Sequence, residues 1–147
     1  MKTEYRIKPI GVIHSPFNDR KEVPIQPRFS RDKGEVELFD EYSEGLKDIE
    51  GFSHIILVYF FHKSQDYSLL VRPYLDNKEK GVFATRFPER PNHIGISVVK
   101  LLEKKENTLI VGGIDVIDGT PLLDIKPYVP PFDNTKTVKI GWLEGKL

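Results

Sequence analysis

Four polar segments of the sequence carry side chains that could bind a ligand or move a proton. In the first segment, Gln26 lies between Pro24 and Pro27. The two prolines restrict the backbone, and the glutamine amide can offer two donors and one acceptor to the edge of a planar ligand. An ordinary proline-rich loop is the alternative interpretation.

The second segment is the pair His62 and Lys63, which follows the apolar run of residues 55–61. Side chains at the end of a buried strand are held by a rigid core and still reach solvent, which suits ligand-binding groups. A single histidine at such a position is also typical of a capping or hydrogen-bonding residue. The pair is therefore a candidate ligand contact with a structural alternative.

The third segment, residues 84–95, surrounds Arg86 and Arg90 with prolines. Arg90 precedes Pro91 and is thereby restricted to extended conformations, which favours a rigid loop. The planar guanidinium matches a carboxylate or a phosphate, so one arginine could hold each kind of anion. The alternative is that the arginines pair with Glu89 and other surface acids.

The fourth segment, residues 118–130, opens with Asp118 and Gly119, a strong turn signal. Asp124 and Lys126 are two residues apart and therefore share one face of an extended chain. They could bind ribose hydroxyls or orient an amide, and the alternative is a surface ion pair of little energetic value. The residues expected to be buried here are Leu123, Ile125 and Tyr128.

The residue types that are missing exclude several kinds of site. The chain has no cysteine, which removes disulfides, thiolate zinc sites and thiol nucleophiles. Its four histidines show no metal-ligand spacing, so no metal is expected. There is no Gly-x-Ser-x-Gly elbow of a serine hydrolase and no glycine-rich Rossmann or Walker loop. A nucleotide-like ligand would need a non-Rossmann site.

Length and charge set further bounds. A chain of 147 residues without a composition shift or repeat predicts one domain over residues 1–147. Its 22 basic and 22 acidic residues balance, so any contact with nucleic acid must come from a local basic patch. The longest apolar run is far shorter than a membrane span, and we expect a soluble intracellular protein without a membrane partner.

Short β-type runs between turn residues predict a mainly β fold, a barrel or a sandwich. The run of residues 55–61 does not alternate and is expected to be a central strand covered on both faces. Val36 and Leu38 alternate with glutamates, as in a strand near an edge. The expected strands are residues 5–13, 35–39, 54–61, 69–75, 82–86, 94–102 and 108–116.

One short helix is expected between the second and third strands. Tyr42, Leu46 and Ile49 recur at spacings of four and three, which predicts about two helical turns that end at Gly51. The strands at 94–102 and 108–116 are expected to form a hairpin, although the first arm could also be helical. The candidate caps at the start of the helix are Asp40 and Ser43.

These segments together resemble the TsaA-like, or TrmO, family. Each match is modest alone, but the matches run in order through almost the whole chain. They are residues 10–17, 24–26, 46–62, 84–86, 90–95 and 118–128. The resemblance implies a compact, non-Rossmann β-barrel with one or two short helices.

The same resemblance implies an activity and its partners. It implies S-adenosylmethionine as cofactor and N6-methylation of threonylcarbamoyl-adenosine beside the anticodon of a threonine-accepting tRNA. It also implies a homodimer in the cytoplasm. The residues that it places at the cofactor are Pro24, Ile25, Gln26, His62, Lys63, Arg90, Asp118, Gly119, Thr120, Asp124 and Lys126.

The sequence departs from the family pattern in two places. Longer bacterial members continue beyond the stretch that ends at Tyr128, whereas this chain ends soon after it, so tRNA docking would differ or need a partner. The position of His93 more often holds a small residue or proline, and an imidazole there would alter the substrate side.

Methyl transfer to an amide-like nitrogen needs alignment of donor and acceptor and is helped by a general base. Asp124 is the first candidate base and His93 the second, while Tyr128 could stack on a base. A non-catalytic sensor of S-adenosylmethionine or a nucleotide is the rival hypothesis. Methylation of a protein or small molecule is a third.

Overall fold

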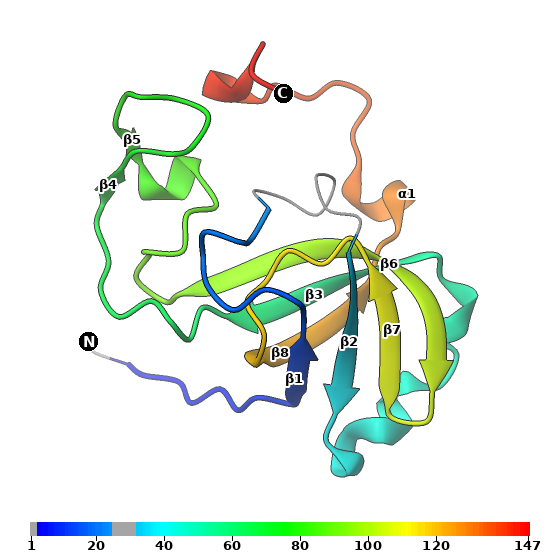
Figure 1. Cartoon of the computed structure of the whole chain (residues 1–147). Coiled ribbons are helices and arrows are strands. Elements are labelled where there is room, and N and C mark those ends of the chain that lie inside the picture. The colour runs from blue at the N-terminus through cyan, green and yellow to red at the C-terminus, as the bar shows by residue number, and fades with distance from the viewer. Residues whose placement is uncertain (1–2, 25–31) are drawn as a thin grey trace.

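The computed structural model describes residues 3–24 and 32–147, and its centre is a closed antiparallel β-barrel (Figure 1). The strand order is β1-β2-β7-β6-β3-β8, and β8 pairs with β1 to close the barrel. The mainly β, non-Rossmann prediction is confirmed. The barrel strands are β1 Gly11–His14, β2 Lys33–Leu38, β3 His54–Phe60, β6 Ile94–Lys105, β7 Thr108–Gly112 and β8 Thr120–Pro127.

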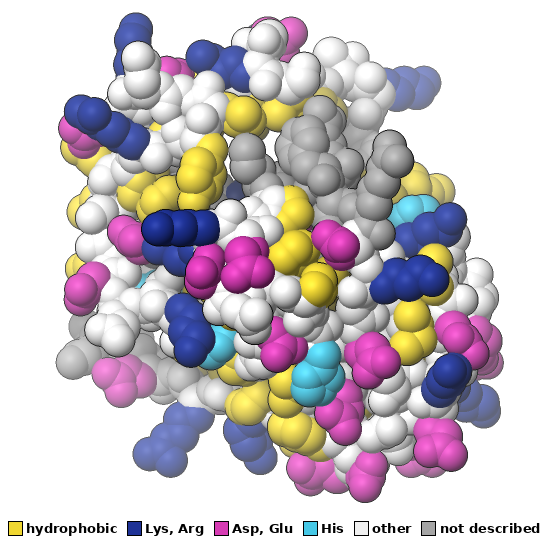
Figure 2. All heavy atoms as spheres, in the orientation of Figure 1, with side chains coloured by type: hydrophobic (Ala, Val, Ile, Leu, Met, Phe, Trp, Pro, Cys, Tyr) yellow, Lys and Arg dark blue, Asp and Glu magenta, His cyan; other side chains and the backbone are white. Residues whose placement is uncertain are grey.

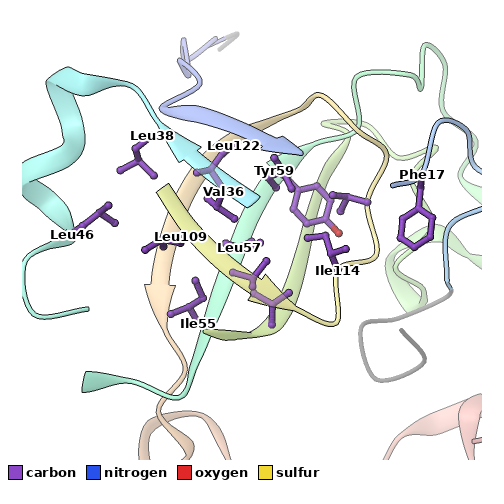
Figure 3. Packing of buried hydrophobic residues seen from close by; sticks show 14 residues of the cluster. Phe17, Val36, Leu38, Leu46, Ile55, Leu57, Tyr59, Leu109, Ile114 and Leu122 are labelled. Carbon is purple, nitrogen blue, oxygen red and sulfur yellow. The ribbon is translucent and has the colours of Figure 1, made fainter. Parts of the chain in front are cut away.

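The barrel interior is filled by every second residue of its strands. In β2, Val36 and Leu38 are buried while the glutamates between them face water, as period-two alternation requires. Figure 3 shows these side chains from all the strands meeting on one axis, with Leu46 at one end and Phe17 at the other. Buried strand residues of this cluster are Ile13, Val36, Leu38, Ile55, Leu57, Tyr59, Val99, Leu109, Val111 and Leu122.

Two predictions about strand environment were wrong for one reason, namely that the sheet closes. β2 pairs with both β1 and β7, so it is not an edge strand. In β3, Ile55, Leu57 and Tyr59 are buried, whereas the intervening residues are half-buried and Phe60 is exposed. Its outer face is therefore only partly covered, because a barrel buries each strand from the inside.

The predicted hairpin is confirmed. β6 pairs antiparallel with β7, and Lys105 lies opposite Thr108 across a tight turn. Glu106 takes a positive φ of 54° in that turn, a left-handed conformation typical of short hairpin connections. The alternative of a helical first arm is wrong.

The predicted helix is replaced by two 3₁₀ helices, Asp40–Leu46 and Ile49–Gly51. Asp48 lies between them with a φ of 71°, which interrupts the helical path. The apolar face is as predicted, since Leu46 is buried with Tyr42 packed against the core, and the end at Gly51 is confirmed. The predicted caps are wrong, because Phe39 holds the N-cap position without a side-chain hydrogen bond.

Three predicted strands are shorter or different. Residues 5–9 precede β1 without strand structure, and Tyr5 is 85% exposed. Only Leu70–Val71 (β4) of the expected strand 69–75 pairs, with Lys80–Gly81 (β5), in a separate two-stranded sheet. Residues 82–86, predicted as a strand, contain the 3₁₀ helix Val82–Ala84. Short apolar runs are ambiguous between strand and helix.

β8 was not among the strands predicted from the sequence, and it contains an irregularity that local alternation does not reveal. Leu122 is buried and Leu123 is only half-buried, the reverse of the prediction for Leu123. The register explains this: Tyr59 lies opposite Leu122 and Val58 opposite Asp124, so Leu123 is the extra residue of a β-bulge. Ile125 then packs against the core as predicted.

The remaining elements lie outside the barrel. The α-helix α1 Pro130–Asp133 and the 3₁₀ helix Gly141–Leu143 belong to the C-terminal segment, which lies beyond one end of the barrel in Figure 1. Positive and negative side chains are interspersed over the face shown in Figure 2, in keeping with a net charge of 0. Among the described residues, no helix has the length and apolar character needed to cross a membrane.

Candidate functional site

A cavity of about 1360 Å³, called here the main cavity, is lined by Tyr59 of the core and by residues of β6 and of several loops. Its walls come from segments far apart in the sequence: the loop after β1, the loop 61–90, the outer face of β6, the segment after β7 and the C-terminal segment. The strands hold these loops at fixed positions, so the barrel is the scaffold of the site.

Five residues of the predicted cofactor site line the main cavity together. They come from the loop after β1, the end of β3, the arginine loop and the start of β8. The barrel therefore gathers four of the polar segments into one place, although they are distant in sequence. The five residues are Pro24, His62, Lys63, Arg90 and Thr120.

The Arg90 side chain is fixed by its own loop. Its Nη1 atom donates hydrogen bonds to the carbonyl oxygens of Thr85 at 2.9 Å and Phe87 at 3.1 Å, and its guanidinium lies 6.0 Å from the centre of the Phe83 ring. These contacts position the guanidinium at the cavity wall without neutralising its charge. Glu89 pairs with Arg20 at 3.1 Å, whereas Arg90 bonds to these two carbonyl oxygens.

His62 faces the main cavity in its neutral form at pH 7. Burial lowers the pKa of this imidazole, and the charge of the adjacent Lys63 lowers it further. A neutral imidazole can accept a hydrogen bond on one ring nitrogen and donate from the other. His62 can therefore serve a polar ligand without adding charge to the cavity.

Two predicted site residues, Asp118 and Gly119, shape the turn into β8. Oδ1 of Asp118 accepts a hydrogen bond from the backbone N–H of Ser15 at 3.0 Å. Gly119 takes a φ of 83°, which side chains disfavour, and its N–H bonds to the carbonyl of Ile13. Neither lines the main cavity. Ile25 and Gln26 lie outside the described residues.

Asp124 and Lys126 lie on the outside of the barrel. The Lys126 Nζ atom is 2.9 Å from Oδ2 of Asp124, with both side chains about half exposed, so the surface ion pair that the sequence left open is what forms. Asp124 borders a separate cavity of about 420 Å³, which also includes Leu38 and Leu46 from the opposite end of the core. The first candidate base is thus remote from the main cavity.

His93 and Tyr128 also lie outside the main cavity. His93 takes a φ of 48°, and its Nε2 atom is 2.9 Å from the carbonyl oxygen of Asp66. Its ring contacts Phe60 edge-on, and the Tyr128 ring contacts His54. Each imidazole or phenol already has a structural partner within the fold.

Sequence reasoning missed a buried polar chain of three residues inside the cavity end of the barrel. The Tyr59 hydroxyl lies 2.8 Å from the Ser97 hydroxyl, which donates a 2.5 Å hydrogen bond to Oδ1 of Asp115. Ser97 is fully buried and Asp115 is 7% exposed. The signal was present in the sequence, because Asp115 is an acid within the apolar run 108–116.

Burial raises the pKa of Asp115 to about 7, against the lowering effects of the Ser97 hydrogen bond and of the positive charge of Arg86. Burial and the charge of Asp115 together raise the pKa of Tyr59, so the phenol stays protonated at neutral pH. The carboxyl of Asp115 is therefore the group that titrates near neutrality.

The main cavity is strongly cationic although the whole chain is neutral. Among the described residues that line it, six carry a positive side chain and one, Asp115, carries a carboxyl. These cations form, in one concave site, the kind of local basic patch that a chain of net charge 0 would need for contact with nucleic acid. The cations are Arg20, Lys33, Lys63, Arg86, Arg90 and Lys100.

The C-terminal segment supplies an apolar wall of the same cavity. The Trp142 ring N–H donates to the carbonyl oxygen of Ala84 at 2.8 Å, and Lys80 lies 5.5 Å from the ring centre. Lys146 pairs with Asp76 at 3.5 Å. These contacts fasten the segment to the loop before the arginines, with Ile140 and Leu143 also at the wall.

Comparison with known proteins agrees with this architecture. The family model of the tRNA-methyltransferase O N-terminal domain matches residues 12–134. A probable S-adenosyl-L-methionine-binding protein from Pyrococcus abyssi is 61% identical over 141 residues, which are 95% of this chain and 77% of that protein. The tRNA (adenine(37)-N6)-methyltransferase of Escherichia coli is 38% identical over 139 residues, 87% of this chain and 59% of that enzyme.

A solved structure shares the fold. The crystal structure of TrmO from Pseudomonas aeruginosa superposes with a TM-score of 0.80 at 37% identity, over 95% of this chain and 63% of that one. The chain thus spans less than two thirds of the Escherichia coli enzyme and of this structure. Because the match to the tRNA-methyltransferase O N-terminal domain extends from β1 through β8, the chain belongs to the TrmO family.

Proposed function

We propose that this protein is an S-adenosylmethionine-dependent methyltransferase that modifies N6 of an adenosine in tRNA. The observation that carries the proposal is the main cavity, which joins apolar walls and six cations, one of them the fixed Arg90, in a member of the TrmO family. The names of the relatives supply the chemistry: S-adenosylmethionine binding and methylation of adenine 37 in tRNA.

The residues of the cavity fit S-adenosylmethionine. Ligand pockets usually measure about 300–1,000 Å³, so a cavity of about 1360 Å³ has room for a cofactor and part of a second substrate. Arg90 would hold the carboxylate of the methionine part, and His62 and Thr120 would bind polar edges. Pro24, with Ile25 and Gln26, would complete the site. The cofactor supplies an electrophilic methyl group when bound.

The cations of the cavity support a nucleic-acid substrate. Lys63 and Lys100 line the cavity, are exposed to solvent, and form no ion pair with another described residue. Lys and Arg that neutralise phosphates supply much of the affinity for nucleic acids. A protein with net charge 0 can therefore bind RNA through this one concave surface.

We further propose threonylcarbamoyl-adenosine in a threonine-accepting tRNA as the acceptor. The support is the family to which the chain belongs, together with a cavity larger than one cofactor requires.

We also propose that the chain forms a single domain and a cytoplasmic homodimer. Exposed apolar side chains on residues 67–83 favour a partner surface. They are Tyr67, Leu69, Leu70, Tyr74 and Phe83.

The chain's own residues would act mainly by positioning. The barrel end and the Trp142 wall would exclude water, and the arginine loop would orient the cofactor so that donor and acceptor are in line. Holding two reactants in reactive geometry can supply much of a methyl transfer's rate enhancement.

The test is methyl transfer to RNA. The protein is incubated with S-adenosylmethionine labelled in its methyl group and with tRNA that carries threonylcarbamoyl-adenosine, and nucleosides are analysed by mass spectrometry. We expect label at N6 of that nucleoside. R90A and Q26A should weaken cofactor binding measured by calorimetry. If both variants bind the cofactor as tightly as the wild type, the site assignment is wrong.

A sensor of S-adenosylmethionine is the second candidate function. The observation that favours it is that the Pyrococcus relative, 61% identical, is named for cofactor binding alone. A sensor would bind the cofactor tightly and leave RNA unlabelled in the same assay. Label on a protein or a small molecule would instead support a methyltransferase with another acceptor.

A further inference from the structure

One ionisable group of the main cavity has no role in the function proposed above. Asp115 is the single acid among the described residues that line the cavity, and its carboxyl lies inside a site with six cations. It is 7% exposed. Burying a carboxyl costs free energy, and a buried acid within a cleft is a common sign of a functional group.

N6-methylation requires a proton acceptor. The N6 nitrogen gains a carbon and loses its hydrogen, so a group within reach must take the proton. Asp124 and His93, the candidates from the sequence, lie outside the main cavity, and Asp124 is paired with Lys126. The reacting nitrogen, bound in the cavity, would reach neither.

We infer that Asp115 is the proton acceptor of the methyl transfer. The inference rests on the proposed function. In the step, the bond between the sulfonium sulfur and the methyl carbon breaks, and a bond between N6 and that carbon forms. The N6–H bond breaks, and its proton passes to the Asp115 carboxylate. S-adenosylhomocysteine leaves with the electron pair of the broken S–C bond, and the carboxyl later returns the proton to water.

The hydrogen-bond chain holds the carboxyl for this role. Ser97 on β6 donates to Oδ1 of Asp115 at 2.5 Å, and Tyr59 on β3 lies 2.8 Å from the same hydroxyl. Both partners belong to strands of the barrel, so the acid has a rigid mount. Ile114 and Val116 on either side of it are buried and keep bulk water from that flank.

The charged and titratable neighbours allow the carboxyl to ionise at neutral pH. Arg86, from the loop that follows the 3₁₀ helix Val82–Ala84, attracts the carboxylate, while burial disfavours it. Tyr59 stays protonated. The balance places the pKa of Asp115 at about 7, which matches the working range of a general base.

His62 is the competing acceptor. It lines the same cavity and is neutral at pH 7, because burial and then the charge of Lys63 lower its pKa. A group with a lower pKa binds a proton less tightly, so His62 is the weaker base of the two. Among the described residues, no side chain forms a hydrogen bond with His62, whereas Ser97 fixes Asp115.

The experiment compares wild type, D115N, D115E and H62Q in the tRNA assay between pH 5.5 and 9, with calorimetry of cofactor binding. E41Q, an exposed acid outside both cavities, is the matched control. The wild-type rate should rise through about pH 7 and then level. D115N should lower kcat by about 10²–10⁴-fold and lose that pH dependence, with cofactor affinity within about threefold, and D115E should recover part of kcat. Carbon-detected NMR should show the Asp115 carboxyl titrating near neutrality.

Three other results of this experiment would contradict either the role of Asp115 or the proposed function. A D115N enzyme with wild-type kcat and pH profile overturns the inference and leaves the proposed function intact. Loss of kcat and of the pH dependence in H62Q but not in D115N assigns the proton to His62. A wild-type protein that binds cofactor and labels no RNA overturns the proposed function, and the role of Asp115 falls with it.

Discussion

Ser97 and Asp115 form a 2.5 Å hydrogen bond inside the barrel, between strand β6 and the segment that follows β7. Such a bond compensates only part of the cost of removing a carboxyl from water, because one oxygen partner replaces several waters. The buried Asp115 carboxyl therefore lowers the free energy of unfolding, and it lowers this free energy more when the carboxyl is ionised than when it is neutral.

We predict that D115N is more stable than the wild type at alkaline pH. The pKa of Asp115 rises from its ordinary 3.8 to about 7 on folding, so the folded state favours the neutral acid. This favourable contribution is complete below about pH 4 and is lost as pH rises through about 7. One pKa unit corresponds to about 1.4 kcal/mol, so the gain of D115N at pH 8 should be about 2 kcal/mol or more.

Urea unfolding of the two proteins between pH 4 and 8 measures this difference. The advantage of D115N should shrink as the pH falls, because Asp115 then becomes neutral as well. E41Q, which changes an exposed acid, should show no comparable trend. A stability difference between D115N and the wild type that stays constant from pH 4 to 8 would show that folding does not raise the pKa of Asp115.

Trp142 is the single tryptophan of the chain and lines the main cavity, so it reports on that site directly. We predict that S-adenosylmethionine changes the tryptophan fluorescence in a saturable way, because a bound adenosine alters the surroundings of the indole. W142F should bind cofactor with affinity reduced no more than about tenfold by calorimetry and show no fluorescence change. An unchanged wild-type signal at saturating cofactor would place the ligand elsewhere.

The sequence predicted the barrel better than it predicted the site. Alternation in β2 and the β-branched pair in β6 are local properties, so they identified strands correctly. The β8 strand was missed because its bulge at Leu123 shifts the alternation by one residue, and only the pairing with β3 reveals that shift. The edge position predicted for β2 failed because barrel closure depends on distant strands.

For the site, the family motifs in the sequence identified the segments that form it, but they did not show in which direction each side chain points. His62 and Arg90 reach the main cavity, whereas Asp124 in an equally matched motif faces outward because of the bulge before it. Asp115 was overlooked because a single acid in an apolar run has many explanations until Ser97 and Tyr59 are seen beside it. Ser97 and Asp115 are 18 positions apart in the sequence, and Tyr59 and Ser97 are 38 positions apart, so local sequence patterns do not reveal these contacts.

We predict that G95A distorts the main cavity and lowers stability by about 1–3 kcal/mol. A Cβ at Gly95 would lie 2.5 Å from the Phe61 ring and 2.7 Å from the Tyr59 ring, and the Tyr59 ring is packed in the core. Thermal unfolding and cofactor calorimetry measure the two effects. Gly45 has open space around its Cβ position, so G45A is the control and should change neither.

We predict that R90A lowers the affinity for S-adenosylmethionine by about 10–100-fold, because a charge-assisted hydrogen bond is worth about 1.5–3 kcal/mol. R90K should recover little of it, since lysine lacks the planar fork that the carbonyls of Thr85 and Phe87 hold. R72A, an exposed arginine outside both cavities, should bind as the wild type does. Equal losses in R90A and R72A would indicate a general effect of charge.

We predict that tRNA binding weakens steeply with salt and that the slope depends on the cations of the main cavity. Binding that releases counterions makes the logarithm of the affinity fall linearly with the logarithm of the salt concentration, by nearly one unit of slope for each phosphate neutralised. Lys63 and Lys100 line the cavity and form no ion pair with another described residue, so K63A and K100A should each reduce the slope by about one. Lys105 pairs with Glu103 outside the cavity, and K105A should leave the slope unchanged. Titrations of labelled tRNA at several salt concentrations would contradict the proposed RNA surface if all three variants kept the wild-type slope.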